Sequence, residues 1–552
     1  MNSIFIIIIA LAAFFWAYKV YAKKLETIWQ INPANSVPSK AKYDGVDFVP
    51  AKNWLVLLGH HFSSIAGAGP IVGPVIACCI WGWGPVLLWV IIGTIFFGAV
   101  HDFGALAVSV REGGCSIANV ASKVISKRAY YIFGIFVLLA LILVIAVFLY
   151  LCADTFVKES KIVLPSLGLI PVAIFTGFLL YRRKMNQVGA TGIGLGLLVL
   201  LVILGQKFFP TGISFNQWVI VLLIYSFCAS ILPVNILLQP RDYLSSFLLF
   251  FGMIMGFLGL LISRPSMELP AFISYNSSQG SLWPMLFVIV ACGAISGFHC
   301  LISSGTSSKQ INNERDIKKI GYGAMLLEGL LAVLVILAIG AGLGKQCLID
   351  KSSPVVIFGK GYGEISRSVL GGFGGVLAII ILNAFILTTL DTATRITRYI
   401  AEEFFKIKNR YISTFIVVAL GGWLALAKDS LNTPLWKKLW PAFGASNQLV
   451  AALALFVISC WLLSKNIPPT PSAGGIPQRT KFACGKPYRL TLYPAIFMLI
   501  TTLAALAYQF SNHLKNGDYL LLGITSLLVV LALVMTFEVI GVFRKKKSGL
   551  TA

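Results

Sequence analysis

Charged residues are scarce in this sequence. Only 12% of its 552 residues are Asp, Glu, Lys or Arg, whereas soluble domains carry about a quarter, and 58% are apolar. Apolar runs recur from end to end, and most reach the ~18 residues that cross a bilayer as a helix. The alternation of apolar and polar residues that marks a membrane β-barrel is missing. The composition excludes a soluble globule and predicts an all-α polytopic membrane protein.

Signatures of enzymes and of ATP-driven pumps are also missing. The sequence contains neither G-x-S-x-G nor H-E-x-x-H. The segment nearest to a phosphate-binding loop, G-A-G-L-G-K-Q from Gly340, lacks the first-glycine spacing and the Ser or Thr after Lys345. The ten cysteines form no C-x-x-C pair and fall mainly in apolar runs, where they pack as small hydrophobes. We therefore expect no enzyme, no catalytic residue, no metal site and no cofactor.

Fifteen apolar runs are interpreted as about 15 transmembrane helices. The runs are 3–18, 54–80, 85–109, 131–152, 168–181, 189–205, 217–238, 244–263, 283–303, 321–344, 369–390, 411–427, 439–463, 491–510 and 519–542. The 44 Lys and Arg residues divide 32 to 12 between alternate connections. Basic residues that flank spans stay in the cytoplasm, so we expect the N-terminus outside and the C-terminus inside. This placement accounts for most of the net charge of +24, and nucleic-acid binding is not expected.

No polar stretch is long enough to form a soluble domain. The longest are 19–53, 345–368 and the Pro/Gly-rich 464–490. The expected organisation is a first span and cytoplasmic loop (1–53), a core (54–463), a cytoplasmic Pro/Gly loop (464–490), and two peripheral spans with a basic tail (491–552). The first run is expected to be a retained span, because its basic residues follow it instead of preceding it. Function must then reside within the membrane.

The second run contains G-H-H-F-S-S-I-A-G-A-G-P-I-V-G-P, residues 59–74. Pro70 and Pro74 cannot donate backbone hydrogen bonds, and the glycines add flexibility, so we expect a helix that is discontinuous between about Gly67 and Pro74. Such breaks in membrane transporters hold substrates and ions at the half-helix ends. A kinked helix packed through small residues is the alternative. The candidate ligand-binding residues here are His60, His61, Ser63, Ser64, Gly67 and Gly69.

Four of the five histidines lie in or beside apolar runs: His60, His61, His101 and His299. Asp102 follows His101 directly. Ionisable side chains at membrane depth are costly and usually functional, as proton relays or as partners of a charged ligand. The alternative is a histidine that is only hydrogen-bonded within the core. We expect His61, Asp102 and His299 to take part in coupling.

The ninth run repeats a feature of the second. His61 and Gly67 are six residues apart, as are His299 and Gly305, and hydroxyls fill both intervals. The two runs cross in opposite directions, as an inverted repeat would, although chance is an alternative. Ser303, Ser304, Thr306 and Ser307 offer oxygen ligands for a hard cation or a substrate carboxylate; alternatively, they are packing hydroxyls.

A second pairing competes with this one. The seventh run ends in L-P-V-N-I-L-L-Q-P-R-D-Y-L, with Asn235 between two prolines, and lies five runs after the second, also in the opposite direction. Arg241 and Asp242 follow it, either as part of a site or as the cytoplasmic end of a helix. The sequence leaves both pairings open. Further polar residues in apolar surroundings are Glu328, Asn383, Asp391, Arg395, Asn447 and Gln448.

These segments resemble the carbon starvation protein A (CstA) family. The resemblance rests on G-H-H-F-x-S-I-A-G-A-G-P-I-V-G-P, G-A-V-H-D-F, P-V-N-x-L-L-Q-P-R-D-Y-L, S-G-F-H-x-L-I-S-S-G-T-S-S-K-Q, L-D-T-A-T-R and W-P-x-F-G-A-S-N-Q-L, in order over about residues 50 to 455. It implies ion-coupled uptake of peptides, or of pyruvate in some members, across a bacterial inner membrane. It also implies the amino acid–polyamine–organocation architecture, two inverted five-helix repeats whose first helices are broken. The chain is shorter than the longest members, mainly near its C-terminus.

The resulting hypothesis is a symporter that works by alternating access in the lipid bilayer of the inner membrane during carbon starvation. Its partners would be small peptides, pyruvate or other small carboxylates, and its coupling ion H+ or Na+. The histidines favour protons, whereas the serine cluster suits sodium equally well. A channel or a starvation-sensing membrane protein is the alternative, because broken helices also line pores. The expected substrate-binding residues are His60, His61, Ser63, Ser64, Gly67, Gly69, Asn235 and His299, and the coupling residues are His61, Asp102, His299, Ser303, Ser304 and Thr306.

Overall fold

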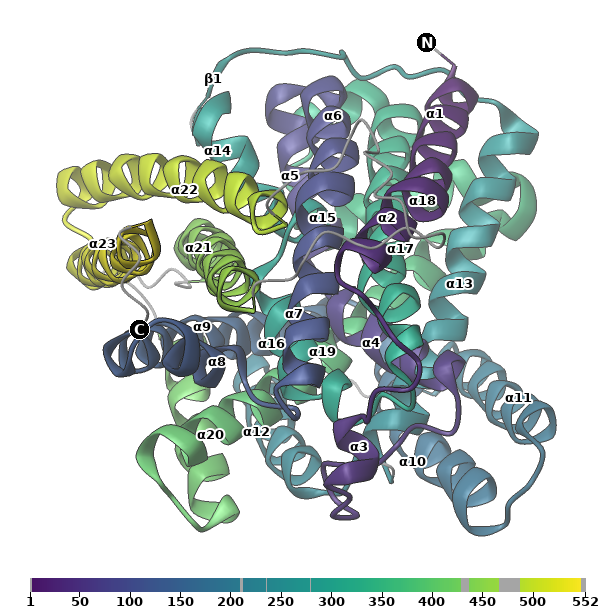
Figure 1. Ribbon diagram of the computed structural model, residues 1–552. Coiled ribbons are helices and arrows are strands. Elements are labelled where there is room, and N and C mark those ends of the chain that lie inside the picture. Colours follow the sequence, from purple (N-terminus) through teal and green to yellow (C-terminus); the bar gives the residue numbers. More distant parts are fainter. Residues whose placement is uncertain are drawn as a thin grey trace.

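The computed structural model describes residues 2–208, 212–234, 236–277, 279–427, 436–465 and 487–547, and helices dominate this part of the chain (Figure 1). Its only strands are β1 (Asn276–Ser277) and β2 (Gly280–Ser281), which form one short antiparallel pair. The all-α prediction is therefore confirmed. Asn235 and most of the predicted Pro/Gly loop lie outside the described residues.

The helices follow one another closely along the chain. The first half contains α1 (Ser3–Trp16), α2 (Ala22–Ile28), α3 (Pro38–Ala41), α4 (Trp54–Ile65), α5 (Gly69–Trp81), α6 (Trp83–Gly93), α7 (Ala99–Arg111), α8 (Ile117–Val124), α9 (Lys127–Lys158), α10 (Val163–Gly177), α11 (Gln187–Gly205), α12 (Phe215–Ile231) and α13 (Leu238–Ser263). The second half contains α14 (Leu282–Ile289), α15 (Ala291–Ala294), α16 (Gly297–Gly305), α17 (Gly323–Leu337), α18 (Pro354–Leu370), α19 (Gly374–Phe405), α20 (Arg410–Leu426), α21 (Trp436–Ser464), α22 (Arg489–Asn516) and α23 (Tyr519–Lys547).

Eleven helical segments of the described chain are long and apolar enough to cross a membrane, or twelve when the bent pair α4–α5 counts as one span. Each of the fifteen predicted runs overlaps a helix. The four that are not among the eleven are the bent pair, the interrupted α14–α16, and the 17-residue helices α12 and α20. The total of fifteen spans remains a prediction.

Two boundaries differ from the sequence expectation. The first helix continues through a π-helical turn to Ile28, ten residues beyond the predicted end. The seventh run ends at Ile231, and Arg241 and Asp242 lie in the first turns of α13. They lie at the start of α13 and not at the end of the seventh run, because Pro240 near the start of α13 needs no intrahelical hydrogen bond there and lets the helix begin before it.

The second and ninth runs lie side by side in opposite directions at the centre of the molecule. α4 contacts α16, while α5 contacts α14 and α15. Their backbones approach closely: a Cβ on Gly69 would lie 2.4 Å from Cys292, and a Cβ on Gly293 would lie 3.6 Å from Pro70. Small residues at these positions therefore allow the two interrupted helices to meet.

The surrounding contacts favour pairing the second run with the ninth. α9 packs against α19, α12 against α20, α13 against α4, and α21 against α16. The helices α10 and α11 pack mainly against each other, as an inserted hairpin. Without this hairpin the ninth run is the fifth span after the second, which is the spacing of a five-helix repeat. Outside this core, α22 and α23 pack on α21 at the periphery (Figure 1).

Candidate functional site

The helix that the sequence predicts to be discontinuous is broken. α4 ends at Ile65, α5 begins at Gly69, and their axes meet at 42°. The break occupies residues 66–68 and does not extend to Pro74, which lies inside α5. Pro70 takes an N-terminal position of α5, where its missing N–H costs nothing.

Threonines of α19 complete the broken end of α4. In a continuous helix, the Ser63 and Ser64 carbonyls would accept bonds from N–H groups four residues ahead. Here the Gly67 N–H bonds a nearer carbonyl instead. The Thr388 and Thr389 hydroxyls donate to Ser63 and Ser64 over 2.8 and 3.2 Å. Sequence reasoning missed both threonines, and their only signal was a hydroxyl pair inside an apolar run.

The glycines at the break allow close packing in this conformation. A Cβ on Gly67 would lie 2.6 Å from Thr389 Oγ1, and one on Gly69 would touch Cys292. Gly67 and Gly69 therefore pack against neighbouring helices of the described chain and do not line the pocket beside α16 and α19. Beside the second break, a cavity of about 10 Å³ lies between α9, α16 and α21, which is room for about one water molecule.

Asn447 of α21 completes the second break, between Ala294 and Gly297. Its Oδ1 accepts from the Phe298 N–H at 2.8 Å, and its Nδ2 lies 3.0 Å from Ser296 Oγ. The amide thereby caps the start of α16. The sequence had marked Asn447 only as a polar residue in apolar surroundings.

A group that we call the His299 centre lies beside the breaks. It comprises His101, Asp102, His299 and Glu328, whose side chains are all buried. His299 Nδ1 lies 2.9 Å from Asp102 Oδ2, and His299 Nε2 lies 3.2 Å from Glu328 Oε2. His101 Nδ1 lies 2.7 Å from the other Asp102 oxygen. The structure thus joins Asp102 and His299, as the sequence suggested, and adds His101 and Glu328.

The His299 centre has the composition of a proton acceptor. It contains two carboxyl groups and two imidazoles. With both carboxylates deprotonated and both rings neutral, its net charge is −2, so it becomes neutral only when it binds two protons. A buried net charge is strongly unfavourable. Among the described residues, three buried atoms of the centre have no hydrogen bond of good geometry: both Glu328 carboxylate oxygens and His101 Nε2. Few hydrogen bonds therefore fix the protonation of these side chains.

His61 stands apart from this centre. Its Nδ1 lies 2.7 Å from Ser307 Oγ, and its buried Nε2 has no hydrogen-bond partner among the residues that the structure describes. It is near enough to Asp102 and His299 to interact with them electrostatically, without contacting either through a hydrogen bond or ion pair. His61 lies in α4, before the first break, and His299 lies in α16, after the second break. Because the two runs are antiparallel, both histidines lie on the same side of the breaks.

A second buried group, the Arg241 cluster, connects four helices. It comprises His60, Tyr225, Arg241, Asp242 and Asp391. His60 Nδ1 lies 2.7 Å from Asp242 Oδ2, and Arg241 Nη2 lies 2.8 Å from Asp242 Oδ1. The Arg241 guanidinium also contacts the Asp391 carboxylate and the Tyr225 hydroxyl. The sequence placed only His60 in the site and left Arg241 and Asp242 undecided.

The predicted serine residues are engaged within the protein. Ser63 Oγ donates to the Asp242 carbonyl at 2.6 Å, and Ser64 Oγ donates to the His60 carbonyl at 2.8 Å. Both belong to α4 and help to hold it against α13 and α19.

The hydroxyls of the predicted cation site have different surroundings. Within the described part of the chain, Ser303 Oγ has no hydrogen-bond partner, Ser304 Oγ accepts from the Ile117 N–H at 3.4 Å, and Thr306 donates to the carbonyl one turn before it. Ser307 Oγ contacts His61. Within the described residues, no three His, Cys, Asp or Glu side chains are grouped so that they could hold a metal ion.

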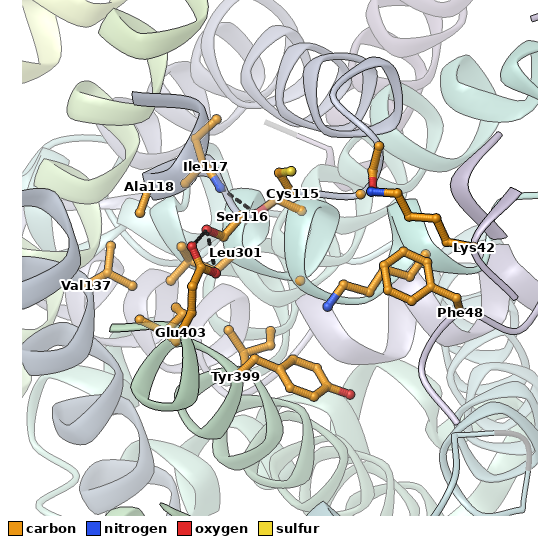
Figure 2. A pocket seen from close by; sticks show the side chains of 17 residues that line it. Lys42, Phe48, Cys115, Ser116, Ile117, Ala118, Val137, Leu301, Tyr399 and Glu403 are labelled. Atoms are coloured by element: carbon orange, nitrogen blue, oxygen red, sulfur yellow. Dashed lines mark hydrogen bonds between the residues drawn. The ribbon is translucent and has the colours of Figure 1, made fainter. Parts of the chain in front are cut away.

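A pocket of about 160 Å³ opens beside α16 and α19 (Figure 2). Figure 2 shows Glu403 beside Ser116 on one wall and Phe48 on the other, and the Ser116 hydroxyl lies 3.2 Å from the carboxylate. Lys309 Nζ lies 4.2 Å from the centre of the Tyr399 ring. Burial lowers the pKa of the Lys309 ammonium below its ordinary value, against the opposing effect of Asp47 and Glu403.

Four segments of the chain that follow or precede predicted membrane spans, one of them the last turns of α19, meet around this pocket. They contribute Lys42, Gly113 to Ala118, Lys309 and Glu403. All four belong to the set of connections that is rich in basic residues, which groups them at one end of the molecule.

Two antiparallel broken helices, completed by side chains from neighbouring helices and flanked by buried ionisable groups, define a membrane transporter of the inverted-repeat class. Solved structures share this fold. MhsT in complex with L-phenylalanine matches with a TM-score of 0.55 and 13% identity, over 83% of this chain and 99% of that one. A manganese transporter from Eremococcus coleocola matches with a TM-score of 0.50 and 13% identity, over 91% and 99%.

The chain belongs to the carbon starvation protein CstA family, whose model matches residues 2–342 and 338–505. It is 29% identical to the pyruvate/proton symporter BtsT of Escherichia coli, over 92% of this chain and 81% of that protein. It is 30% identical to the peptide transporter CstA of Bacillus subtilis, over 83% and 85%. The protein is thus a multi-pass membrane transporter of a bacterial family, and not an enzyme.

Proposed function

We propose that the protein imports small peptides or pyruvate into a bacterial cell across the inner membrane, driven by a proton gradient, by alternating access. The observation that carries this proposal is the His299 centre, in which one buried imidazole lies between two carboxyl groups. Its relatives include a pyruvate/proton symporter and peptide transporters, which supports these two substrate classes. Import during carbon starvation accords with the family description.

The closed packing at the breaks supports alternating access. The half-helix ends at residues 66–68 and 295–296 are where the substrate would bind, near His60, His61, Ser63, Ser64, Gly67, Gly69 and His299. In this conformation these groups are buried, whereas a pocket is present at the end rich in basic residues. Separating α4 and α16 from α19 on that side would join the pocket to the breaks and release the substrate inward.

Protons are favoured over sodium by the chemistry of the buried groups. The three hydroxyls of Ser303, Ser304 and Thr306 have separate surroundings, while the His299 centre offers four titratable side chains in contact. Sodium coupling at those hydroxyls is the second candidate, because Ser303 Oγ has a free lone pair.

Proteoliposomes containing the purified protein test the proposal. Uptake of labelled dipeptides and of pyruvate is measured under an imposed pH gradient, a sodium gradient, or neither. Uptake above the equilibrium level with the pH gradient alone is expected for at least one substrate. Accumulation that depends on the sodium gradient would mean that sodium, and not the proton, is the coupling ion. Flux that never saturates and shows no counterflow would indicate a channel.

A further inference from the structure

Without His60, the members of the Arg241 cluster do not balance one another's charge. Arg241 contributes one positive charge, and Asp242 and Asp391 contribute two negative charges. Tyr225 is an uncharged phenol. With a neutral His60 the cluster has a net charge of −1, and with a charged His60 it is neutral. All four charged or titratable side chains are buried, so the neutral state is strongly favoured.

The charged groups around α4 have other partners. His61 contacts Ser307, and His299 lies between Asp102 and Glu328. Lys319 lies over the ring of Trp54, at the far end of α4, and Arg395 of α19 lies 3.7 Å from Asp47. Among the described residues, none of them forms an ion pair with His60, Asp242 or Asp391. The proton that would neutralise the cluster must therefore bind one of the cluster's own side chains. Both carboxylates are already paired with Arg241, whereas the His60 ring has a second nitrogen, Nε2, that can take a proton, so the geometry favours His60.

The surroundings of His60 suit both of its protonation states. Its Nε2 lies 3.2 Å from the side-chain nitrogen of Gln310, whose oxygen accepts from Gln239 at 2.8 Å. If the ring donates from Nδ1 to Asp242 and accepts at Nε2 from the Gln310 amide, it is neutral. Rotating both amides by half a turn presents the Gln310 oxygen to a protonated Nε2 and keeps the bond between the two amides.

We propose that His60 is a second proton-binding site of this transporter, separate from the His299 centre. A proton from water on the open side binds Nε2 as the amides turn, and it leaves Nε2 when the cluster next meets water. The bound proton removes the net charge and favours the packing of α4 against α13 and α19. Its loss favours separation of α4 from them. This inference rests on the proposed proton-coupled transport, and it raises by one the number of protons moved with each substrate.

A direct test needs no substrate. The whole protein, labelled with ¹⁵N-histidine in lipid bilayers, contains five histidines. His60→Gln identifies the His60 signals, and the glutamine can still donate to Asp242. At about pH 7 we expect the His60 signals to be those of a ring protonated on both nitrogens. A neutral His60 under these conditions overturns the proposal.

Asp391→Asn isolates the effect of charge from that of the hydrogen bond. It leaves the contact between His60 and Asp242 intact and removes the negative charge of Asp391, which is connected to Asp242 through Arg241. We expect His60 to become neutral in this variant. A His60 that stays protonated would mean that Asp242 alone holds the proton, and would contradict the charge-balance argument. His513→Gln, at the end of α22, is the matched control and should leave the His60 signals unchanged.

The proton-to-substrate ratio provides the second readout. It is obtained from the membrane potential that stops net uptake at a fixed substrate gradient. His60→Gln should move one proton fewer per substrate than the wild type, and His513→Gln should equal the wild type. Equal ratios in wild type and His60→Gln overturn the second site. If the wild type shows no gradient-driven uptake, the proposed function fails, and the ¹⁵N measurement alone decides whether His60 binds the proton.

Discussion

The Thr389 hydroxyl of α19 donates to the Ser64 carbonyl of α4 over 3.2 Å, at the point where α4 loses its own helical hydrogen bonds. Thr388 does the same for Ser63. The two partners in each bond are 325 residues apart in the chain. The shape of the broken helix therefore depends on a helix in the other half of the protein.

Thr389→Val should destabilise the protein. Valine has nearly the shape of threonine but cannot donate, so the buried Ser64 carbonyl is left without its partner, at a cost of about 1–3 kcal/mol. Thermal unfolding in detergent should show a lower midpoint. Thr397→Val is the control, because its hydroxyl bonds a carbonyl of its own helix that remains in the helical ladder. Equal midpoints for the two variants would mean that the Thr389 hydrogen bond contributes no more to stability than the Thr397 hydrogen bond does.

Gly67→Ala should impair both stability and transport. The added Cβ would lie 2.6 Å from Thr389 Oγ1, so α4 and α19 would have to separate, at a cost of about 1–3 kcal/mol. Gly196→Ala in α11 is the control, since no atom lies within 4 Å of its added Cβ. Pairing Gly67→Ala with Thr389→Ala should recover part of the loss by removing the clashing hydroxyl. A Gly67→Ala variant as active and stable as the wild type would show that the close approach is not required.

His299→Gln, His61→Gln and Glu328→Gln should uncouple transport from the proton gradient. Each glutamine can keep a hydrogen bond while losing the titration, so near-normal membrane expression is expected. Accumulation driven by a pH gradient should fall at least tenfold, while exchange without a gradient should be retained better. The measurement compares both modes in the same proteoliposomes. If the two histidine variants accumulate substrate like the wild type, the proton role is wrong and the hydroxyls of Ser303 to Thr306 become the better candidates.

The N-terminus should lie outside and the C-terminus inside. The expectation follows from the 32 to 12 division of basic residues between alternate connections. A phosphatase that is active only in the periplasm, fused after Lys547, should be silent, whereas the same enzyme fused after Asn2 should be active. Activity at the C-terminal fusion would overturn both the orientation and the odd number of spans.

The sequence alone determined the class of the protein and which of its apolar runs contains a broken helix. Long apolar runs require a membrane because water cannot solvate them favourably, and this holds whatever packs against them. The glycines and prolines between Gly67 and Pro74 act on their own backbone, so the break could be predicted locally. The burial of Asp102 and His299 also followed from their apolar neighbours. The shared His–Gly spacing of the second and ninth runs, however, aligns α4 with α16. In an inverted repeat, α4 corresponds instead to the segment before the second break, and α16 lies after that break.

Tertiary structure decided which side chains meet. Asp242 reaches His60 across 182 residues, and Asp391 meets Arg241 across 150. Nothing in the local sequence specifies such pairs, because each charge needs only some partner and the packing of α4, α13 and α19 selects which one. For the same reason Glu328 gave no sign of its contact with His299. The sequence placed costly charges in the membrane, and only the fold determined how they are balanced.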